Sequence, residues 1–148
     1  MQKITSFTVD HTKLECGMYV SRVDGDITTY DLRHKKPNVD AVMDNETMHT
    51  LEHMLATFLR NSEIAEKIIY FGPMGCQTGF YLLVRNANNQ ETKTVLIKAL
   101  EATINHNGEV FGNSAVECGN HKTLNLKKAQ TEAKKYLKIL KNTTTFNY

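Results

Sequence analysis

The first third of the chain has the alternating and clustered β-branched and aromatic residues of β-strands, over residues 4–9 and 18–33. Within the second range, Asp24-Gly25 separates MYVSRV from ITTYDLR. An Asp-Gly pair between two such runs is a strong signal for a β-hairpin. We therefore expect a β-rich start to the chain, followed by a loop at KKPNVD, residues 35–40.

Later segments place apolar residues at the spacing of an α-helix. Residues 49–60 form the first of these, after a polar stretch in which Asp44, Asn45 or Thr47 can cap the helix. Residues 94–105, TVLIKALEATIN, show the same spacing.

The last predicted helix is amphipathic, with lysines opposite an apolar stripe. Its buried stripe is predicted to consist of Leu126, Ala129, Ala133, Leu137 and Leu140. Between the helices, residues 67–84 predict a strand, a tight glycine-rich loop and a second strand or helix start, and residues 109–118 look extended. Hairpins interspersed with helices predict an α+β fold, a mainly antiparallel sheet with helices packed on one face as a two-layer sandwich.

Length and composition favour one domain. A chain of 148 residues with 41% hydrophobic residues can bury one core, so we expect a single catalytic domain over residues 1–148. The net charge of +2 gives no general attraction to nucleic acid or to an anionic membrane. The lysines near the C-terminus are better explained as a solvated helix face than as a nucleic-acid site.

The start of the chain lacks the apolar core of a signal peptide, and no apolar run approaches membrane-spanning length. We therefore expect a cytoplasmic protein with no membrane partner. In that compartment Cys16, Cys76 and Cys118 are reduced thiols, not a disulfide framework. Cys16 has no chemically active neighbour in the sequence and is interpreted as structural.

The stretch MHTLEHML contains the first candidate chemistry. On a wheel of about 100° per residue, His49, His53 and Arg60 fall within about 40° of one another, opposite the apolar face, with Glu52 at their flank. Two imidazoles at i and i+4 can meet one metal ion. The pair also suits a solvated helix face, but the interleaved Glu52 favours chemistry.

A metal site needs a third protein ligand, and VECGNH, residues 116–121, offers Cys118 and His121. The residues alone do not choose between these two or exclude the further histidines His11, His34 and His106. Thiolate and imidazole donors suit zinc, ferrous iron or cobalt better than magnesium or calcium.

Cys76 lies in GPMGCQTGFY, where three glycines allow tight backbone turns and close approach of a substrate. Such a thiol can act as a nucleophile or a proton shuttle if a neighbouring charge lowers its pKa. An inert buried cysteine beside a structural turn is the alternative.

Five stretches together resemble the LuxS family of S-ribosylhomocysteine lyases in order and spacing over nearly the whole chain. They are SFTVDHTK (6–13), YDLRHKKPN (30–38), HTLEHMLATFLRN (49–61), GPMGCQTGFYL (72–82) and ECG (117–119). The resemblance implies a homodimer with sites at the subunit interface, each subunit a sheet packed against helices. It also implies a lyase of the methyl cycle that produces homocysteine and 4,5-dihydroxy-2,3-pentanedione, the precursor of autoinducer-2 used in quorum sensing.

The resemblance carries roles over by matching position. His49, His53 and Cys118 would hold one divalent metal ion per subunit, Fe2+ before Zn2+ or Co2+, with no organic cofactor, and His121 is left out of this set. Cys76 and Glu52 would be the general acid/base groups. The small-molecule substrate, S-ribosylhomocysteine, would be bound by Ser6, Phe7, His11, Arg33 and Arg60.

The chain departs from the family's usual pattern near the thiol. Tyr70 stands where members commonly carry an acidic residue that helps to recognise the substrate, and Gly72 stands where they carry a serine. Lys35 replaces a frequent cysteine. These departures affect how the amino-acid end of the substrate is held, whereas the residues of the chemistry all match.

Two alternative functions use the same helix. A small zinc metallopeptidase of the inverted His-x-x-Glu-His type would use Glu52 as base and needs a downstream carboxylate as third ligand. A non-catalytic zinc-binding module would be closed by His49, His53, Cys118 and His121.

Overall fold

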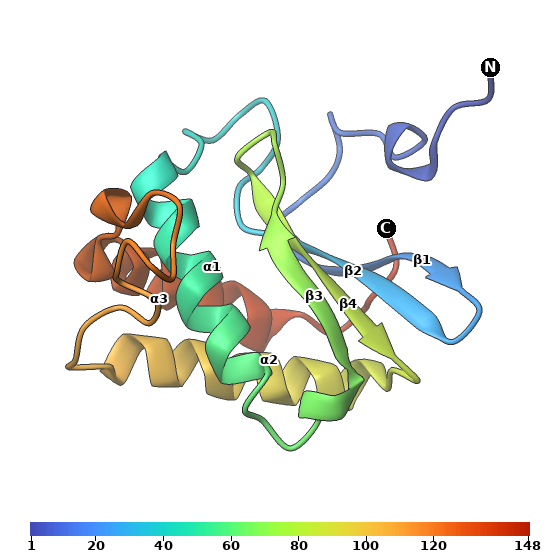
Figure 1. Cartoon of the computed structure of the whole chain (residues 1–148). Coiled ribbons are helices and arrows are strands. Elements are labelled where there is room, and N and C mark those ends of the chain that lie inside the picture. Colours follow the sequence, from blue (N-terminus) through green and yellow to red (C-terminus); the bar gives the residue numbers. More distant parts are fainter.

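Four strands form one open antiparallel sheet in the computed structural model, which describes residues 1–148 (Figure 1). The strands are β1 (Gly17–Asp24), β2 (Ile27–Arg33), β3 (Ile68–Pro73) and β4 (Gly79–Arg85), and their spatial order is β1-β2-β4-β3. The helices are α1 (Asn45–Leu59), α2 (Asn89–Asn105) and α3 (Leu126–Asn142), with short 3₁₀ turns at Thr5–Phe7, Ala65–Lys67 and His121–Thr123.

The three helices gather on one side of the sheet (Figure 1). Alternate strand residues such as Leu32 and Leu82 are fully buried in one core with Leu51, Leu55 and Leu96 of the helices. One face of the sheet and one face of each helix are mainly apolar, and these apolar faces pack against each other in one core. The predicted α+β class is confirmed. None of the helices combines the length and hydrophobicity needed to cross a membrane.

The predicted hairpin is confirmed: β1 and β2 pair from Gly17↔Arg33 to Asp24↔Ile27. The turn consists of Gly25 and Asp26, and Gly25 has φ +61°, a left-handed conformation that glycine adopts without a Cβ penalty. Residues 67–84 form two strands around a loop, so the strand alternative for the second run is correct.

Two sequence expectations are wrong. Within residues 4–9, Thr5–Phe7 form a 3₁₀ turn in an N-terminal arm, where the Phe7 and Thr8 N–H groups donate to the Ile4 and Thr5 carbonyls and not to a neighbouring strand. Residues 109–118 form turns and no strand. In that segment Gly112 has φ +69°, and the backbone N–H groups of Glu117 and Cys118 both donate to the Ser114 carbonyl, which closes a turn.

Asp44 is the N-cap of α1, and its carboxylate accepts the Thr47 backbone N–H. This side-chain bond satisfies a donor that the first helical turn leaves free. In α3 the stripe is partly as predicted: Ala129, Ala133 and Leu140 are buried, but Leu126 and Leu137 are only half-buried. Tyr136 and Glu132 are buried beside the stripe and were not foreseen.

Candidate metal centre

Helix α1 presents His49 and His53 on the face opposite its buried leucines. Leu51 and Leu55 hold the helix against the core, which leaves the two imidazoles half-buried at the surface of the layer. Their ring centroids are 4.6 Å apart and the planes are nearly perpendicular, at 86°. The i, i+4 spacing therefore brings the two rings together as the sequence predicts.

Cys118 completes this group from a loop 69 residues further along the chain. Its Sγ lies 3.3 Å from His49 Nε2. The ligand atoms of His49, His53 and Cys118 all lie within 4.8 Å of one another, and this group contains neither His121 nor a carboxylate. Tetrahedral bonds of about 2.1 Å to nitrogen and 2.3 Å to sulfur separate two ligand atoms by roughly 3.6 Å. The spacing thus fits one metal ion.

Hydrogen bonds set the tautomer of each imidazole. His53 Nδ1 is 2.7 Å from the Phe111 carbonyl, which can only accept, so Nδ1 carries the proton and Nε2 keeps its lone pair. His49 Nδ1 is 2.7 Å from Thr123 Oγ1. Since Thr123 donates its own proton to the Asn120 carbonyl at 3.1 Å, it accepts from His49. Both Nε2 atoms are left free to bind a metal ion.

The donor set has the chemistry of a transition-metal site. The Asn120 backbone N–H donates to Cys118 Sγ at 3.4 Å, a contact that orients the sulfur. Two imidazole nitrogens and one thiolate suit zinc, ferrous iron or cobalt. The residues present therefore fit a divalent metal ion.

Cys76 lies at the tip of the loop between β3 and β4. Its Sγ is 3.0 Å from Thr78 Oγ1 and 3.8 Å from the Arg33 guanidinium. Burial raises the pKa of the Cys76 thiol, but the Thr78 hydroxyl and backbone N–H and the Arg33 charge outweigh burial and hold that pKa below its ordinary value. The thiol is exposed, so it combines access with an increased thiolate share.

Arg33 is held rigidly beneath this loop. Its guanidinium forms a two-point ion pair with Asp31, with Nε and Nη2 at 3.1 and 2.6 Å from the carboxylate oxygens. Both side chains are only 2% exposed. The remaining nitrogen, Nη1, donates to Thr78 Oγ1 at 2.6 Å as well as to Cys76. Arg33 therefore directs positive charge at the thiol.

Glu52 lines a hollow of about 280 Å³ beside the histidines, together with His49, Asn120 and Pro73 at the end of β3. Its carboxylate is half-buried and makes no hydrogen bond or ion pair within the chain. A nearby contact, Gln77 Nε2 to Asn45 Oδ1 at 3.3 Å, joins the Cys76 loop to the start of α1. The loop thus adjoins the hollow that contains Glu52.

The remaining predicted site residues lie elsewhere within this chain. Ser6, Phe7 and His11 belong to the N-terminal arm and do not line the Glu52 hollow, and Phe7 is 71% exposed. Arg60 lies at the end of α1 and donates to the Ile69 carbonyl at 2.7 Å. Their assignment to substrate binding stays a prediction.

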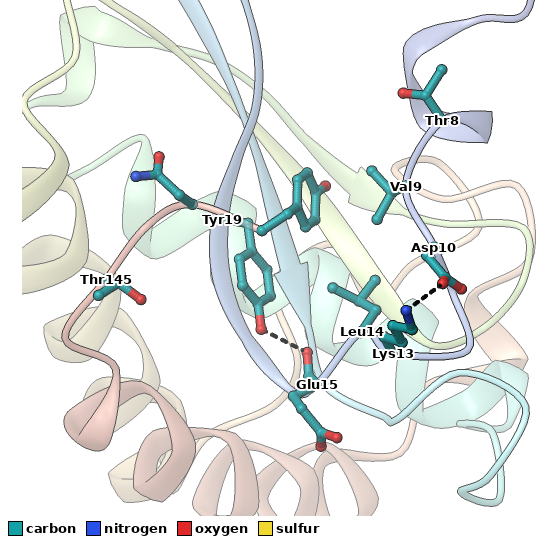
Figure 2. A pocket seen from close by; sticks show the side chains of 10 residues that line it. Thr8, Val9, Asp10, Lys13, Leu14, Glu15, Tyr19 and Thr145 are labelled. Carbon is teal, nitrogen blue, oxygen red and sulfur yellow. Dashed lines mark hydrogen bonds and ion pairs between the residues drawn. The ribbon is translucent and has the colours of Figure 1, made fainter.

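A larger hollow, of about 580 Å³, lies between the arm and the C-terminal tail (Figure 2). Lys13, Leu14 and Tyr19 border it from the arm and β1, and it contains none of the residues of the metal group. Its size does not mark it as the reaction site, because neither Cys76 nor Glu52 lines it.

Comparison with known proteins identifies the family. A profile of S-ribosylhomocysteinase (LuxS) matches residues 4–146. The chain belongs to the LuxS family. It is 48% identical over 148 residues to S-ribosylhomocysteine lyase of Borreliella afzelii strain PKo, covering 96% of this chain and 94% of that protein. The lyase of Desulfotalea psychrophila is 49% identical over 142 residues, covering 92% and 89%.

Membership of the LuxS family agrees with the geometry of the metal group. The family is metal-dependent, and the group His49, His53 and Cys118 could hold the ion. Neither the downstream carboxylate of a metallopeptidase nor the closing His121 of a zinc module belongs to the group. The family match and the geometry therefore give no support to the two alternative functions.

Tyr70 and Gly72 are structurally coupled; they stand where the resemblance leads us to expect an acidic residue and a serine. A Cβ built on Gly72 would collide with the phenol ring of Tyr70, which lies over that glycine and is 49% exposed. A serine at position 72 therefore requires the Tyr70 ring to move away. The absence of a side chain at Gly72 accommodates Tyr70 in this chain.

Several residues that build the centre were missed by sequence reasoning. Thr123 and the Phe111 carbonyl orient the histidines, and Thr78 and Asp31 organise Cys76 and Arg33. Thr78 stands two residues after Cys76 in the same loop motif, so a hydrogen bond from its hydroxyl to the thiol could have been predicted. The Phe111 carbonyl has no signal in the sequence, because every residue carries a carbonyl.

Proposed function

We propose that this chain is an S-ribosylhomocysteine lyase working as a single catalytic domain over residues 1–148. The observation that carries the proposal is the convergence of His49, His53 and Cys118 in a chain of the LuxS family. The products are homocysteine and 4,5-dihydroxy-2,3-pentanedione, the precursor of autoinducer-2. All atoms of the substrate divide between these two products, so no water is consumed.

The reaction moves a carbonyl along the ribose before it breaks the carbon–sulfur bond. Each shift, from C1 to C2 and from C2 to C3, removes a proton from one carbon and returns a proton to its neighbour. With the carbonyl at C3, the C4 proton becomes acidic. Its removal expels the homocysteine sulfur from C5 by β-elimination, and the sulfur takes up a proton. The protein therefore needs groups that both accept and donate protons.

We assign the proton transfers to Cys76 and Glu52. The lowered pKa of the Cys76 thiol gives it a thiolate share that can accept a proton, and the resulting thiol can return it. The Glu52 carboxylate is not engaged by other side chains and borders the hollow beside His49. Positioned acid/base groups each contribute about 10²- to 10⁴-fold to a proton-transfer step.

We propose that His49, His53 and Cys118 hold one divalent metal ion per subunit, with Fe2+ the first choice and Zn2+ or Co2+ as alternatives. When bound, the ion supplies a Lewis acid that stabilises the oxyanion charge arising when a proton leaves beside a carbonyl. The Nδ1–H groups of both histidines stay bonded to Thr123 and Phe111, which keeps the imidazoles in place.

We further propose a homodimer in which the N-terminal arm of one subunit contributes to the partner's site. Ser6, Phe7 and His11 lie outside their own chain's Glu52 hollow, and the arm extends away from the sheet (Figure 1). An exposed Phe7 is an apolar side chain available to a neighbouring subunit. We propose that Arg33 contributes to substrate binding from beneath the Cys76 loop and that Arg60 contributes to it from the edge of the site.

Cys16, Cys76 and Cys118 are all free thiols. A reducing compartment preserves such thiols, including the Cys76 thiol and the Cys118 ligand. We therefore propose a cytoplasmic location.

The test is to incubate anaerobically prepared, Fe2+-loaded protein with S-ribosylhomocysteine and to measure homocysteine by chromatography. Chromatography separates the product from the protein's own three thiols. Cys76→Ala and Glu52→Gln are expected to retain the metal and lose turnover by at least about 10²-fold. His53→Ala is expected to lose the metal.

Cys16→Ala is the matched control, because Cys16 donates to the His34 carbonyl and has no place in the proposed chemistry. Its turnover is expected to equal that of the unmodified protein. No homocysteine from the Fe2+-loaded protein would refute the lyase function. Normal turnover in Cys76→Ala would refute the role of that thiol alone.

A further inference from the structure

Tyr148, the last residue of the chain, lies on the face of the sheet opposite the helices. Tyr30 and Leu32 point into the core, so Asp31 between them points to the other face, where it accepts the Tyr148 hydroxyl at 2.7 Å. The Tyr148 ring stacks on Tyr19, with centroids 4.9 Å apart and planes at 16°. Figure 2 shows Tyr19 at this surface.

The C-terminal tail reaches this position along the edge strand β1. The Val20 N–H donates to the Phe146 carbonyl at 2.7 Å, which adds a backbone bond outside the sheet pairs. The tail is thus attached by a backbone hydrogen bond, an aromatic stack and the Tyr148 hydroxyl. The backbone bond belongs to Phe146, whereas the stack and the hydroxyl bond are both made by the Tyr148 side chain.

Tyr148 forms one end of a continuous hydrogen-bonded series that ends at the Cys76 thiol. The Asp31 carboxylate accepts from Tyr148 and, at 2.6 and 3.1 Å, from Arg33. The third guanidinium nitrogen of Arg33 donates to Thr78 and Cys76. Because Asp31 and Arg33 are each only 2% exposed, water screens this series poorly.

We propose that Tyr148 is a positioning residue for Cys76, acting through Asp31 and Arg33. The inference rests on the proposed role of Cys76 in the lyase. Donation from Tyr148 withdraws negative charge from the Asp31 carboxylate and fixes its orientation. Arg33 can then direct its third nitrogen at the thiol. Without the hydroxyl, Asp31 holds the guanidinium more strongly, and its own negative charge acts on Cys76 with less compensation.

The charged and titratable groups around the thiol are few. Arg33 of β2 faces Cys76 directly and is paired with Asp31, and the charges of Asp31, Arg33 and Cys76 all act on Tyr81 of β4. Burial, followed by the neighbouring Asp31 charge, raises the pKa of the Tyr148 phenol far above its ordinary value. Tyr148 therefore remains a protonated donor at every physiological pH.

The experiment measures alkylation of Cys76 by iodoacetamide between pH 5 and 10 on the metal-loaded, full-length protein, by mass spectrometry of the peptide containing Cys76. Tyr148→Phe keeps the aromatic stack and removes only the hydroxyl. Its alkylation midpoint is expected to rise by about 0.5 pH unit or more. At pH 7, kcat is expected to fall about threefold or more with KM little changed.

Tyr19→Phe is the matched control, since the Tyr19 hydroxyl donates to the Glu15 carbonyl and not to Asp31. Its midpoint is expected to equal that of the unmodified protein. An unchanged midpoint in Tyr148→Phe, or an equal shift in Tyr19→Phe, would overturn the inference. A shift confined to Tyr148→Phe supports it even if Cys76→Ala turns over normally, in which case only the catalytic role of Cys76 fails.

Discussion

Gly112 lies so close to the imidazole of His53 that a Cβ built on it would be 3.1 Å from Nδ1 and 3.3 Å from Cε1. The glycine also has φ +69°, a conformation that residues with a Cβ rarely adopt. The turn that carries the Phe111 carbonyl to His53 is therefore built around a residue without a side chain. This contact joins the loop after α2 to His53 on α1.

Gly112→Ala is expected to weaken metal binding by about tenfold or more, because the added methyl displaces either His53 or the Phe111 carbonyl that orients it. Competition with a chelator of known affinity measures the loss. Gly119→Ala is the control. Gly119 is next to Cys118, the proposed third ligand, but a Cβ there meets nothing within 4 Å, so metal affinity is expected to stay unchanged. Equal affinities in all three proteins would show that the close contact has no effect.

Thr123→Val is expected to reduce metal affinity by about 10- to 100-fold, because His49 Nδ1–H loses its acceptor and the imidazole loses its fixed tautomer. The valine keeps the shape of the threonine side chain. Thr123→Ser restores the hydroxyl and is expected to bind metal nearly normally in the same chelator competition. A Val variant with unimpaired affinity would mean that the helix alone orients His49.

Thr78→Val is expected to raise the pKa of the Cys76 thiol, because the thiolate loses the hydroxyl that lies 3.0 Å away. A thiol is deprotonated above its pKa, so this change lowers the thiolate share at neutral pH and slows both alkylation and turnover. The pH profile of alkylation measures the midpoint. Thr78→Ser keeps the hydroxyl and should keep the midpoint; a shift of equal size in the Ser variant would contradict the explanation.

His34 is expected to make the fold sensitive to acid. Its side chain is 0% exposed, and its ring stacks on that of Tyr136 with the centroids 3.7 Å apart. Nδ1 lies 3.2 Å from the Glu132 carboxylate, whereas Nε2 has no hydrogen-bond partner. Burial lowers the pKa of His34 below its ordinary value, more than Glu132 raises it. As the pH falls below about 6.5, the unfolded chain takes up a proton that the folded chain resists. The free energy of unfolding therefore decreases with falling pH, by up to about 1.4 kcal/mol per pH unit.

Denaturant unfolding of metal-free protein between pH 7.5 and 5.5 tests the effect. His34→Phe keeps the stack on Tyr136 and is expected to lose the His34 part of the slope. Groups that do not contact His34 cancel in the difference between the two proteins, whereas Glu132 loses its His34 partner in the variant. Lys35 still neutralises Glu132 in the variant, at 2.7 Å. Parallel pH profiles for the two proteins would exclude His34 as the cause.

Local spacing was enough to predict the elements that carry the chemistry. The helix over residues 49–60 separates its faces every 3.6 residues, so the proximity of His49 to His53 and the burial of Leu51 and Leu55 follow from the order of residues alone. The Asp24-Gly25 hairpin is equally local, since one glycine and two flanking strands define it. The strand prediction for residues 4–9 was wrong because a strand also needs a partner strand. The prediction of an extended segment at 109–118 was wrong because a turn with a left-handed glycine has no periodicity in the sequence.

By itself, therefore, the sequence determined the α+β class, the histidine pair and the glycine-rich loop of Cys76. The resemblance to the LuxS family already pointed to Cys118, but only the tertiary structure showed that its thiol lies beside the histidines. The structure alone also showed that Thr123 and Phe111 orient the imidazoles and that Tyr148 reaches Asp31. These partners are up to 117 residues apart in sequence. Residue order specifies which face a side chain takes within its own element, whereas distances between elements depend on how loops, tail and sheet pack together.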